Sequence, residues 1–415
     1  MKIAIIGSGI SGLTCAYLIN RRHQVTVFEA SSWIGGHGRD IDVRIGNRSH
    51  TVNTGFVLFE ESNHPNFTRL LDRLGVAFTP VETSFSVSDP ATGFEFSNRN
   101  LNALLSQRRN VLSLSFWHLL REIQRFRRDA LDDYDRQRIA PQLTLGEYLR
   151  LGGYGERLLH HYLAPMGALA WLLSPGELIE FPMQPLVRLF KQHGLLASSE
   201  GPRWYAVQGG TSGYLPALTR SFAERIRTQC PVQAISRDPA GVTVISPLGE
   251  ERFDKVVFAC HSDQALRLID QPTTAEREVL GTLGYVQSEM VLHTDTRLLP
   301  RRASARASWN YRLGSTPDQL PSITYNLNVL QGLALPDRLC LSINQGAAID
   351  PARVLHRFSC SRPFFSRAYT RAQAGARDLQ GINHSYFCGA YWGNGLHEDG
   401  VTSAMRVALA IDKQR

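Results

Sequence analysis

The chain has 415 residues, a net charge of +8 and 43% hydrophobic residues, enough for two subdomains with cores of their own. Only four of its 45 basic residues are lysines, and the arginines are dispersed outside any nucleic-acid-binding module, so we expect no nucleic-acid partner. The six cysteines show no C-x-x-C pair and no metal-ligand spacing, which predicts buried free thiols and no metal.

The first 30 residues predict a βαβ unit that binds a dinucleotide. A buried strand leads into Gly7-Ser8-Gly9-Ile10-Ser11-Gly12, a helix follows, and a second strand ends at Glu29-Ala30. Gly7 permits a sharp turn, Gly9 lets the backbone approach a pyrophosphate, and Gly12 lets helix and strand pack closely. The N–H groups at Ile10 and Ser11 would hold phosphate, and Glu29, with Ala30 beside it, would accept a ribose hydroxyl. A glycine-rich turn in an ordinary α/β domain would explain the glycines but not Glu29.

The segment after Glu29 favours FAD over a nicotinamide cofactor. It reads Ser31-Ser32-Trp33-Ile34-Gly35-Gly36-His37-Gly38-Arg39. A second Gly-Gly at this place is not part of the nicotinamide fingerprint. It resembles the extension in FAD enzymes of the amine oxidase, protoporphyrinogen oxidase and phytoene desaturase group. That resemblance implies that Gly36 and His37 run along the FAD pyrophosphate.

Later segments extend the resemblance over the whole chain, in the order typical of the group. Residues 52–56 (V-N-T-G-F) are similar to its flavin-edge loop, with Asn in place of the usual Asp, and residues 207–215 to its Gly-Gly turn into a helix. Residues 230–260 resemble the strands that return to the FAD domain, and residues 386–401 the closing FAD motif, with Ala390 where relatives carry Asp or Glu. The closest form is the bacterial branch labelled NAD/FAD-binding protein or FAD-dependent oxidoreductase. The further cofactor contacts that the resemblance implies are Thr54, Gly55, Phe56, Val232, Gly389, Asp399, Gly400 and Val401.

These features predict an α/β fold. We expect a Rossmann-like FAD-binding domain of the glutathione-reductase and amine-oxidase type, with a discontinuous mixed α+β substrate domain. The FAD-binding domain is assigned to residues 1–80, 205–265 and 378–415, and the substrate domain to residues 81–204 and 266–377.

The resemblance implies hydride transfer from a substrate to flavin N5, with oxygen or another acceptor taking the electrons afterwards. His397 stands where amine oxidases have a cage aromatic, so it would shape the pocket or move a proton, unless it is a satisfied loop histidine. Trp392 and Tyr391 would wall the site or belong to the core. Glu398 and Asp399 are candidates for acid–base groups or for a helix cap.

The expected substrate is apolar. Many amine oxidases have a lysine that holds a water near flavin N5. Here only Lys191 lies in a suitable segment, which argues against an amine oxidase. The bacterial branch tends to be encoded beside cyclopropane-fatty-acyl-synthase-like methyltransferases, so the resemblance implies oxidation or desaturation of a fatty-acyl or other lipid substrate. The alternatives are an amine oxidase, a redox-neutral flavin isomerase on the same fold, and a binding protein that does not use FAD.

Two segments concern lipid contact. The apolar run 163–173 predicts a tunnel lining or, more simply, core. Residues 116–131 predict a helix with Arg121, Arg125 and Arg128 on its polar face, which suits an anionic membrane or a solvated, ion-paired surface. No run is long enough to span a bilayer and no signal peptide is apparent. We therefore expect a cytoplasmic enzyme, with peripheral contact at the inner membrane as the membrane-bound alternative.

Overall fold

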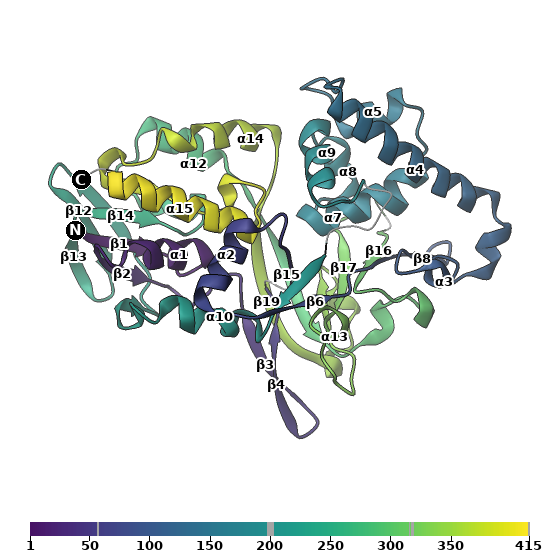
Figure 1. Ribbon diagram of the computed structural model, residues 1–415, viewed down its shortest axis with the longest axis horizontal. Helices are drawn as coiled ribbons and strands as arrows, with labels where there is room; N and C mark the ends of the chain where they lie inside the picture. The colour runs from purple at the N-terminus through teal and green to yellow at the C-terminus, as the bar shows by residue number, and fades with distance from the viewer. Residues whose placement is uncertain (56–57, 197–202, 315, 317–318, 414–415) are drawn as a thin grey trace. The chain divides into compact units, whose positions relative to one another are not determined.

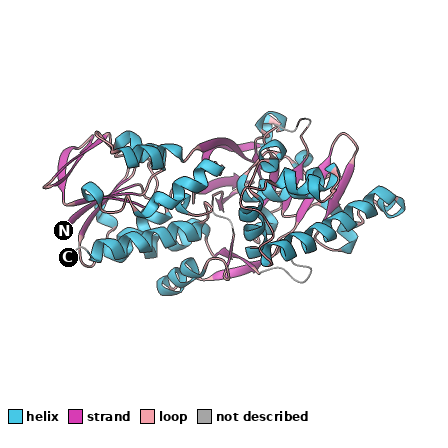
Figure 2. Ribbon diagram, turned by 90° about the horizontal axis from the view of Figure 1, so that it is seen from above, coloured by secondary structure: helices cyan, strands magenta, loops and turns pink. Residues whose placement is uncertain are grey.

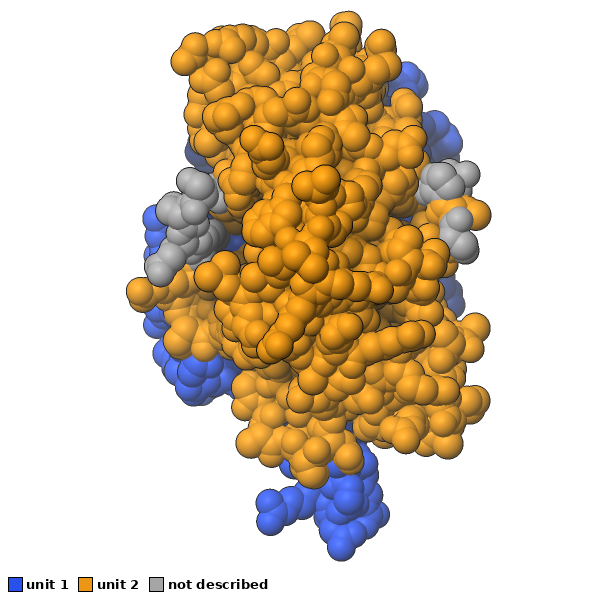
Figure 3. Space-filling model, turned by 90° about the vertical axis from the view of Figure 1, so that its right-hand side faces the viewer, with its two compact units in different colours: residues 1–79, 207–286, 362–415 blue, residues 80–206, 287–361 orange. Residues whose placement is uncertain are grey.

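The computed structural model describes residues 1–55, 58–196, 203–314, 316 and 319–413 (Figure 1). The chain forms two compact units, and it passes from the first to the second and back twice. Unit 1 comprises residues 1–79, 207–286 and 362–415, and unit 2 comprises residues 80–206 and 287–361, drawn in blue and orange in Figure 3. Residues 266–286 and 362–377, which we expected in the substrate domain, lie in unit 1 because their helices pack on its core.

A five-stranded parallel sheet forms the centre of unit 1, in the order β10-β2-β1-β14-β20. Its strands are β1 (Lys2–Ile6), β2 (Gln24–Phe28), β10 (Ile226–Arg227), β14 (Lys255–Phe258) and β20 (Ser385–Phe387). Residues Ile3 to Ile5 of the central strand are fully buried, as in parallel sheets that helices cover on both faces. The Rossmann-like α/β fold is therefore confirmed.

Two smaller sheets and several helices complete unit 1. An antiparallel sheet contains β11 (Ala234–Asp238), β12 (Gly241–Ser246) and β13 (Gly249–Phe253), and a hairpin contains β3 (Asp40–Ile45) and β4 (Arg48–Asn53). The helices are α1 (Ile10–Ile19), α2 (Pro65–Leu74), α10 (Gly210–Thr219), α11 (Ser262–Leu268), α12 (Thr274–Thr282), α14 (Arg367–Ala374) and α15 (His397–Lys413). Helices α1 and α15 lie side by side (Figure 1).

Unit 2 is built on a seven-stranded sheet with the order β19-β15-β18-β17-β16-β7-β8. These strands are β7 (Phe85–Asp89), β8 (Phe94–Ser97), β15 (Tyr285–His293), β16 (Trp309–Arg312), β17 (Ser322–Asn326), β18 (Cys340–Ile343) and β19 (Val354–Pro363). Its helices, cyan in Figure 2, are α3 (Leu101–Leu104), α4 (Leu114–Asp135), α5 (Leu145–Leu151), α6 (Glu156–Leu158), α7 (Ala164–Trp171), α8 (Pro175–Ile179), α9 (Met183–Gln192) and α13 (Leu327–Leu330). A small sheet contains β5 (Phe59–Glu60), β9 (Trp204–Val207) and β6 (Phe78–Val81). The chain passes from unit 1 to unit 2 within β6 and returns to unit 1 within β9.

The structure decides between the two readings of the apolar run 163–173. Leu163, Ala164 and Ala168 are fully buried, and the ring of Trp171 stacks on Phe181 with centroids 4.6 Å apart, so these residues belong to the core. None of the described helices is long and apolar enough to cross a membrane. The described part of the chain also contains no cluster of His, Cys, Asp or Glu side chains that could hold a metal ion.

Candidate active site

The first glycine turn connects β1 to α1 at the carboxyl edge of the parallel sheet. Gly7 has a φ of +107°, and a Cβ there would lie 2.9 Å from the carbonyl oxygen of Ala259. A Cβ at Gly9 would meet only the Cα of Gly36, at 4.0 Å, so the side of the turn at Gly9 is open. The first N–H groups of α1 have no acceptor within the helix, and they stand at the positive end of its dipole. The turn therefore has the open backbone and the donors that a pyrophosphate needs.

Glu29 follows β2 and is tied to this turn. Its Oε2 accepts hydrogen bonds from the Ser8 hydroxyl (2.6 Å) and the Ser8 N–H (3.0 Å), and its Oε1 accepts one from the Ser31 N–H (2.8 Å). A carboxylate has about four acceptor sites, so Oε1 retains one for a ribose hydroxyl. Ala30 is exposed beside Glu29. The Cys230 N–H donates to the Glu29 carbonyl, and the partly buried Val232 follows Cys230 by two residues. The expected ribose-side residues thus lie together.

The Gly35-Gly36 loop crosses the first turn. The Gly35 N–H donates to the carbonyl of Ser8, and Gly36 has a φ of +62°, with a Cβ there coming within 2.9 Å of the Gly9 Cα. His37 is exposed and stacks on His261, with ring centroids 5.3 Å apart, and His261 stacks on Tyr285 at 4.3 Å. Burial, and then His37, lowers the pKa of His261 to about 4. The sequence interpretation did not include His261 or Tyr285.

A second network holds the loop after β4. The side-chain amide of Asn53 donates to Asp40 Oδ1 (2.8 Å) and to the Thr211 hydroxyl (2.7 Å), and its own oxygen accepts from the Gly55 N–H (3.2 Å). Asp40 also accepts backbone N–H groups of Thr211 and Ser212, at the start of α10. Asn53 thus has a structural role in place of the Asp of related enzymes, and Asp40 is a positioning residue that sequence reasoning missed. Thr54 donates to the carbonyl of Arg39, whereas Phe56 lies outside the described residues.

The closing motif brings the start of α15 against the start of α1. A Cβ at Gly400 would lie 2.8 Å from the Ser11 hydroxyl and 3.0 Å from the Ile10 side chain, so only glycine permits this approach. Val401 is buried behind it, and the Gly389 N–H donates to the Ser403 hydroxyl at 3.2 Å. Two positive helix ends therefore converge at the carboxyl edge of the sheet, where they would stabilise negative charge.

The two carboxylates at the start of α15 are both occupied. Glu398 accepts hydrogen bonds from the backbone N–H groups of Asn66 and Phe67 and from the Asn66 amide, so it caps α2 rather than its own helix. Asp399 Oδ2 accepts the N–H groups of Asn394 and Leu396, each at 2.9 Å, and so holds the preceding loop. This placement favours the capping role over the acid–base role for both residues.

His397 lies in an aromatic corner of unit 1. Its ring meets Phe67 edge to face, with centroids 5.6 Å apart, and its Nε2 is 3.5 Å from the hydroxyl of Tyr214. Burial lowers the pKa of His397 to about 3, with smaller contributions from His64 and His37, so the imidazole is neutral at pH 7. Burial raises the pKa of Tyr214, which therefore keeps its proton. Phe67 and Tyr214 were not among the expected site residues, because they lie 330 and 183 positions from His397 along the chain.

Tyr391 and Trp392 lie in the core. Tyr391 is buried with Leu283 and Tyr369, and its carbonyl accepts from the Tyr369 hydroxyl at 3.0 Å. The Trp392 indole donates to the carbonyl of Phe387 (3.0 Å) and packs on the same core. Of the two roles that the sequence left open for these rings, wall of the site or core, this packing favours the core.

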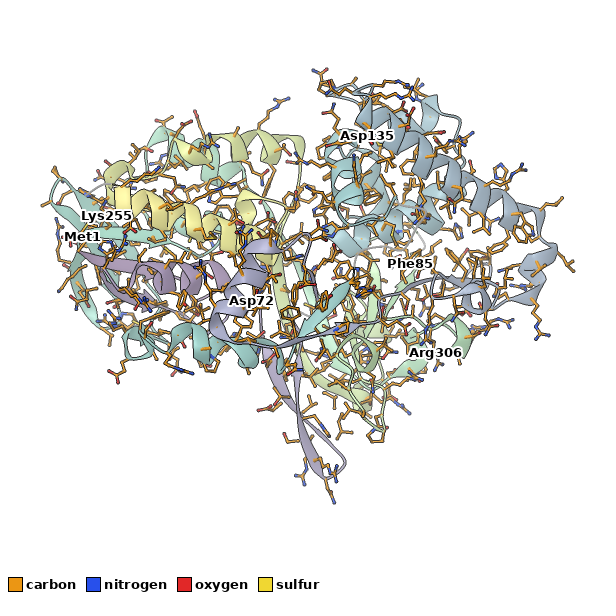
Figure 4. All side chains as sticks on the ribbon, in the orientation of Figure 1. Met1, Asp72, Phe85, Asp135, Lys255 and Arg306 are labelled. Carbon is orange, nitrogen blue, oxygen red and sulfur yellow. The ribbon has the colours of Figure 1, made fainter. Side chains whose placement is uncertain are left out.

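None of the lysines extends from the glycine turn or the closing loop. Lys2 and Lys255 are the first residues of β1 and β14, at the edge of the sheet opposite the glycine turn, and Lys255 lies near Met1 in Figure 4. Lys191 forms an ion pair with Asp135 on unit 2, and Lys413 ends α15. The amine-oxidase arrangement of a lysine and a water therefore has no candidate among the residues of unit 1 that build this site.

The residues present fit FAD. The open face at Gly9 suits the pyrophosphate, and the free acceptor site of Glu29 suits the ribose. The two convergent helix ends suit an anionic edge of the flavin ring.

Comparison with known proteins supports this assignment. Residues 10–317 match the family described as flavin containing amine oxidoreductase. A Mycobacterium tuberculosis protein named as a flavin-containing monoamine oxidase, AofH, is 24% identical over 268 residues, which cover 62% of this chain and 56% of that protein. The chain thus spans little more than half the length of this curated relative.

Solved structures share the fold over the full chain. Cyclohexylamine oxidase from Brevibacterium oxydans superimposes with a TM-score of 0.71 at 16% identity and covers 100% of this chain and 99% of its own. A CLA-producing fatty acid isomerase from P. acnes has a TM-score of 0.67 at 13% identity, with 99% and 98% coverage. The expected superfamily and the FAD cofactor are confirmed, and this chain belongs to the flavin-containing amine oxidoreductase family.

Proposed function

We propose that this protein is an FAD-dependent oxidoreductase that oxidises or desaturates an apolar, fatty-acyl-type substrate. The observation that carries the proposal is the neutral corner of His397, Phe67 and Tyr214 beside two carboxylates that accept backbone N–H groups and hold helix α2 and the closing loop. When bound, FAD supplies the hydride acceptor. The protein supplies orientation, exclusion of water and a fixed electrostatic environment.

The charges in this region favour a neutral substrate over a cationic one. An ammonium group taken out of water needs a carboxylate or several acceptors to offset its desolvation. Glu398 and Asp399, the carboxylates nearest to His397 in sequence, are bonded to backbone N–H groups. A neutral imidazole that packs against the Phe67 ring instead presents a largely apolar surface. The corner is therefore better suited to a C–H bond of an apolar chain.

Each residue of the site has a defined task under this proposal. Glu29 holds the ribose, and the starts of α1 and α15 stabilise negative charge on the cofactor. His397, held by Tyr214, orients the reacting part of the substrate as a neutral imidazole. These roles of individual residues are part of the proposal.

The test is anaerobic reduction of the FAD-loaded protein. We expect the visible flavin absorbance to bleach on addition of a fatty-acyl lipid and to return when air or another electron acceptor is added. A panel of primary amines, including cyclohexylamine, is the comparison. Bleaching by amines and not by lipids would contradict the apolar-substrate proposal while leaving the oxidoreductase intact.

Amine oxidation is the second candidate, because the family and the named relatives favour it. A redox-neutral isomerase is the third, supported by the fold shared with a protein named as a fatty acid isomerase. The same experiment separates them. An isomerase would convert its lipid without net bleaching and without an external acceptor, whereas an oxidase would consume an acceptor with each turnover.

A further inference from the structure

Unit 2 presents a cluster of exposed apolar side chains where a short 3₁₀ turn, η1 (Arg108–Leu112), leads into α4. Leu112 and Leu114 are 90% and 88% exposed, and Val111 and Trp117 are 42% and 44% exposed. Of the 13 large hydrophobic side chains that are exposed in the described chain, five lie between Leu101 and Trp117. Single exposed leucines are ordinary, but a contiguous group of this kind marks an interaction surface.

The fold holds these side chains outward. The Ser113 side chain caps α4 by accepting from the Phe116 N–H, and the Trp117 indole donates to the carbonyl of Val111 at 2.8 Å. Phe116, on the opposite face of the helix, is buried in the core of unit 2. Because the inner face is packed, the outer face cannot rotate inward to hide its leucines.

Basic residues surround this cluster and acidic residues are missing from it. Between positions 96 and 121 the sequence contains Arg99, Arg108, Arg109 and Arg121 and no Asp or Glu. Arg99 is paired with Glu82, but Arg108 and Arg121 are exposed and have no hydrogen-bond or ion-pair partner among the described residues. Two unpaired guanidinium groups beside exposed leucines would complement anionic groups next to an apolar medium.

A shallow groove continues the surface along α4. It has a volume of about 540 Å³ and is lined by Trp117, Leu120 and Gln124 with Arg121, Arg125 and Arg128. Arg125 donates to the carbonyls of Gly152 and Gly153, and Arg128 is paired with Asp129. Of the three arginines that the sequence placed on the polar face of this helix, only Arg121 is therefore available to a ligand.

We propose that the docking surface formed by Val111, Leu112, Leu114, Trp117, Arg108 and Arg121 binds a membrane rich in anionic phospholipid. The leucines would enter the acyl boundary, Trp117 would lie at the headgroup level, and the arginines would contact lipid phosphates. A second copy of the chain is a poorer occupant, since a twofold contact would bring the same unpaired arginines against each other. Membrane docking stands independently of the proposed oxidation of a lipid.

The test is flotation of the full-length, FAD-loaded protein with vesicles of phosphatidylglycerol or of phosphatidylcholine. We expect binding to phosphatidylglycerol, a loss of roughly tenfold or more in the partition coefficient for the double variant L112S/L114S, and a further salt-sensitive loss for R108E/R121E. The matched control is Leu248→Ser, which removes a 71% exposed leucine from the turn between β12 and β13 of unit 1 and should leave binding unchanged.

Three results would overturn the proposal. The wild-type protein could fail to float with phosphatidylglycerol, L112S/L114S could bind as well as Leu248→Ser, or L112S/L114S could convert a dimer into a monomer in gel filtration. The last result would identify a second copy as the occupant. Flavin bleaching by a detergent-dispersed lipid would test the oxidation separately, because it requires no vesicle.

Discussion

Removal of the Glu29 carboxylate should weaken FAD binding and also lower the stability of the apoprotein, and the two effects are measured separately. In Glu29→Ala the ribose hydroxyl loses a charge-assisted acceptor, which contributes about 1.5–3 kcal/mol to binding. That range corresponds to an increase in Kd of roughly 10- to 150-fold, at about 1.4 kcal/mol per factor of ten. The Ser31 N–H and the N–H and hydroxyl of Ser8 also lose their acceptor, and because Ser8 is fully buried this loss costs about 1–3 kcal/mol of the free energy of unfolding.

The assay is calorimetric titration of the apoprotein with FAD, accompanied by thermal unfolding without FAD. Glu250→Ala is the matched control, since Glu250 is exposed at the β13 hairpin and is distant from the glycine turn in sequence and sheet. We expect Glu250→Ala to bind FAD like the wild type. A Kd of Glu29→Ala within about threefold of wild type would be a smaller change than the loss of one such hydrogen bond produces. That result would show that the assignment of Glu29 to the ribose is wrong.

Three further predictions concern the site and the stability of the two units. His397→Ala should retain FAD and slow anaerobic reduction, measured by stopped-flow absorbance; normal turnover of the true substrate would remove its proposed role. Glu276→Gln breaks the buried ion pair with Arg237, so it should lower the free energy of unfolding by about 3–5 kcal/mol in a denaturant titration. A loss below about 1 kcal/mol would show that the ion pair is effectively solvated. Burial lowers the pKa of His293 from 6.5 to about 4, so on acidification the unfolded chain binds the proton before the folded chain does. The free energy of unfolding should therefore be unaffected by this group above pH 6.5 and should decrease as the pH drops toward 4. His293→Asn should reduce that dependence of the melting temperature on pH in a thermal-shift series.

The features that local sequence predicted are those whose chemistry lies within one turn of chain. The β1–α1 turn needs glycine at fixed spacings because the backbone must bend, admit a phosphate and pack closely, and no partner elsewhere in the chain changes those needs. The Gly35-Gly36 loop and the α10 turn were recognised instead by their resemblance to segments of known FAD enzymes. The helix over residues 116–131 was also expected from its periodicity, and α4 extends it to Leu114–Asp135.

The residues whose roles the sequence left open or missed share a different property, namely that distant partners determine their roles. Glu398 caps α2, 332 positions away, and Asp40 caps the start of α10, 171 positions away. A sequence pattern shows that a carboxylate can cap or catalyse, but not which N–H groups will be near it. The sequence left two roles open for Tyr391 and Trp392 for the same reason, because only packing shows whether an aromatic ring meets a ligand or the core.

The sequence by itself therefore determined the parallel sheet and the first glycine turn, because these follow from backbone geometry and short-range spacing, and its resemblance to known enzymes indicated the FAD family. Only the tertiary structure decided that His397 is neutral between Phe67 and Tyr214, that both neighbouring carboxylates are engaged, and that Leu112 and Leu114 face outward. The physical reason is that pKa values, hydrogen-bond partners and exposure depend on groups brought together from remote parts of the chain.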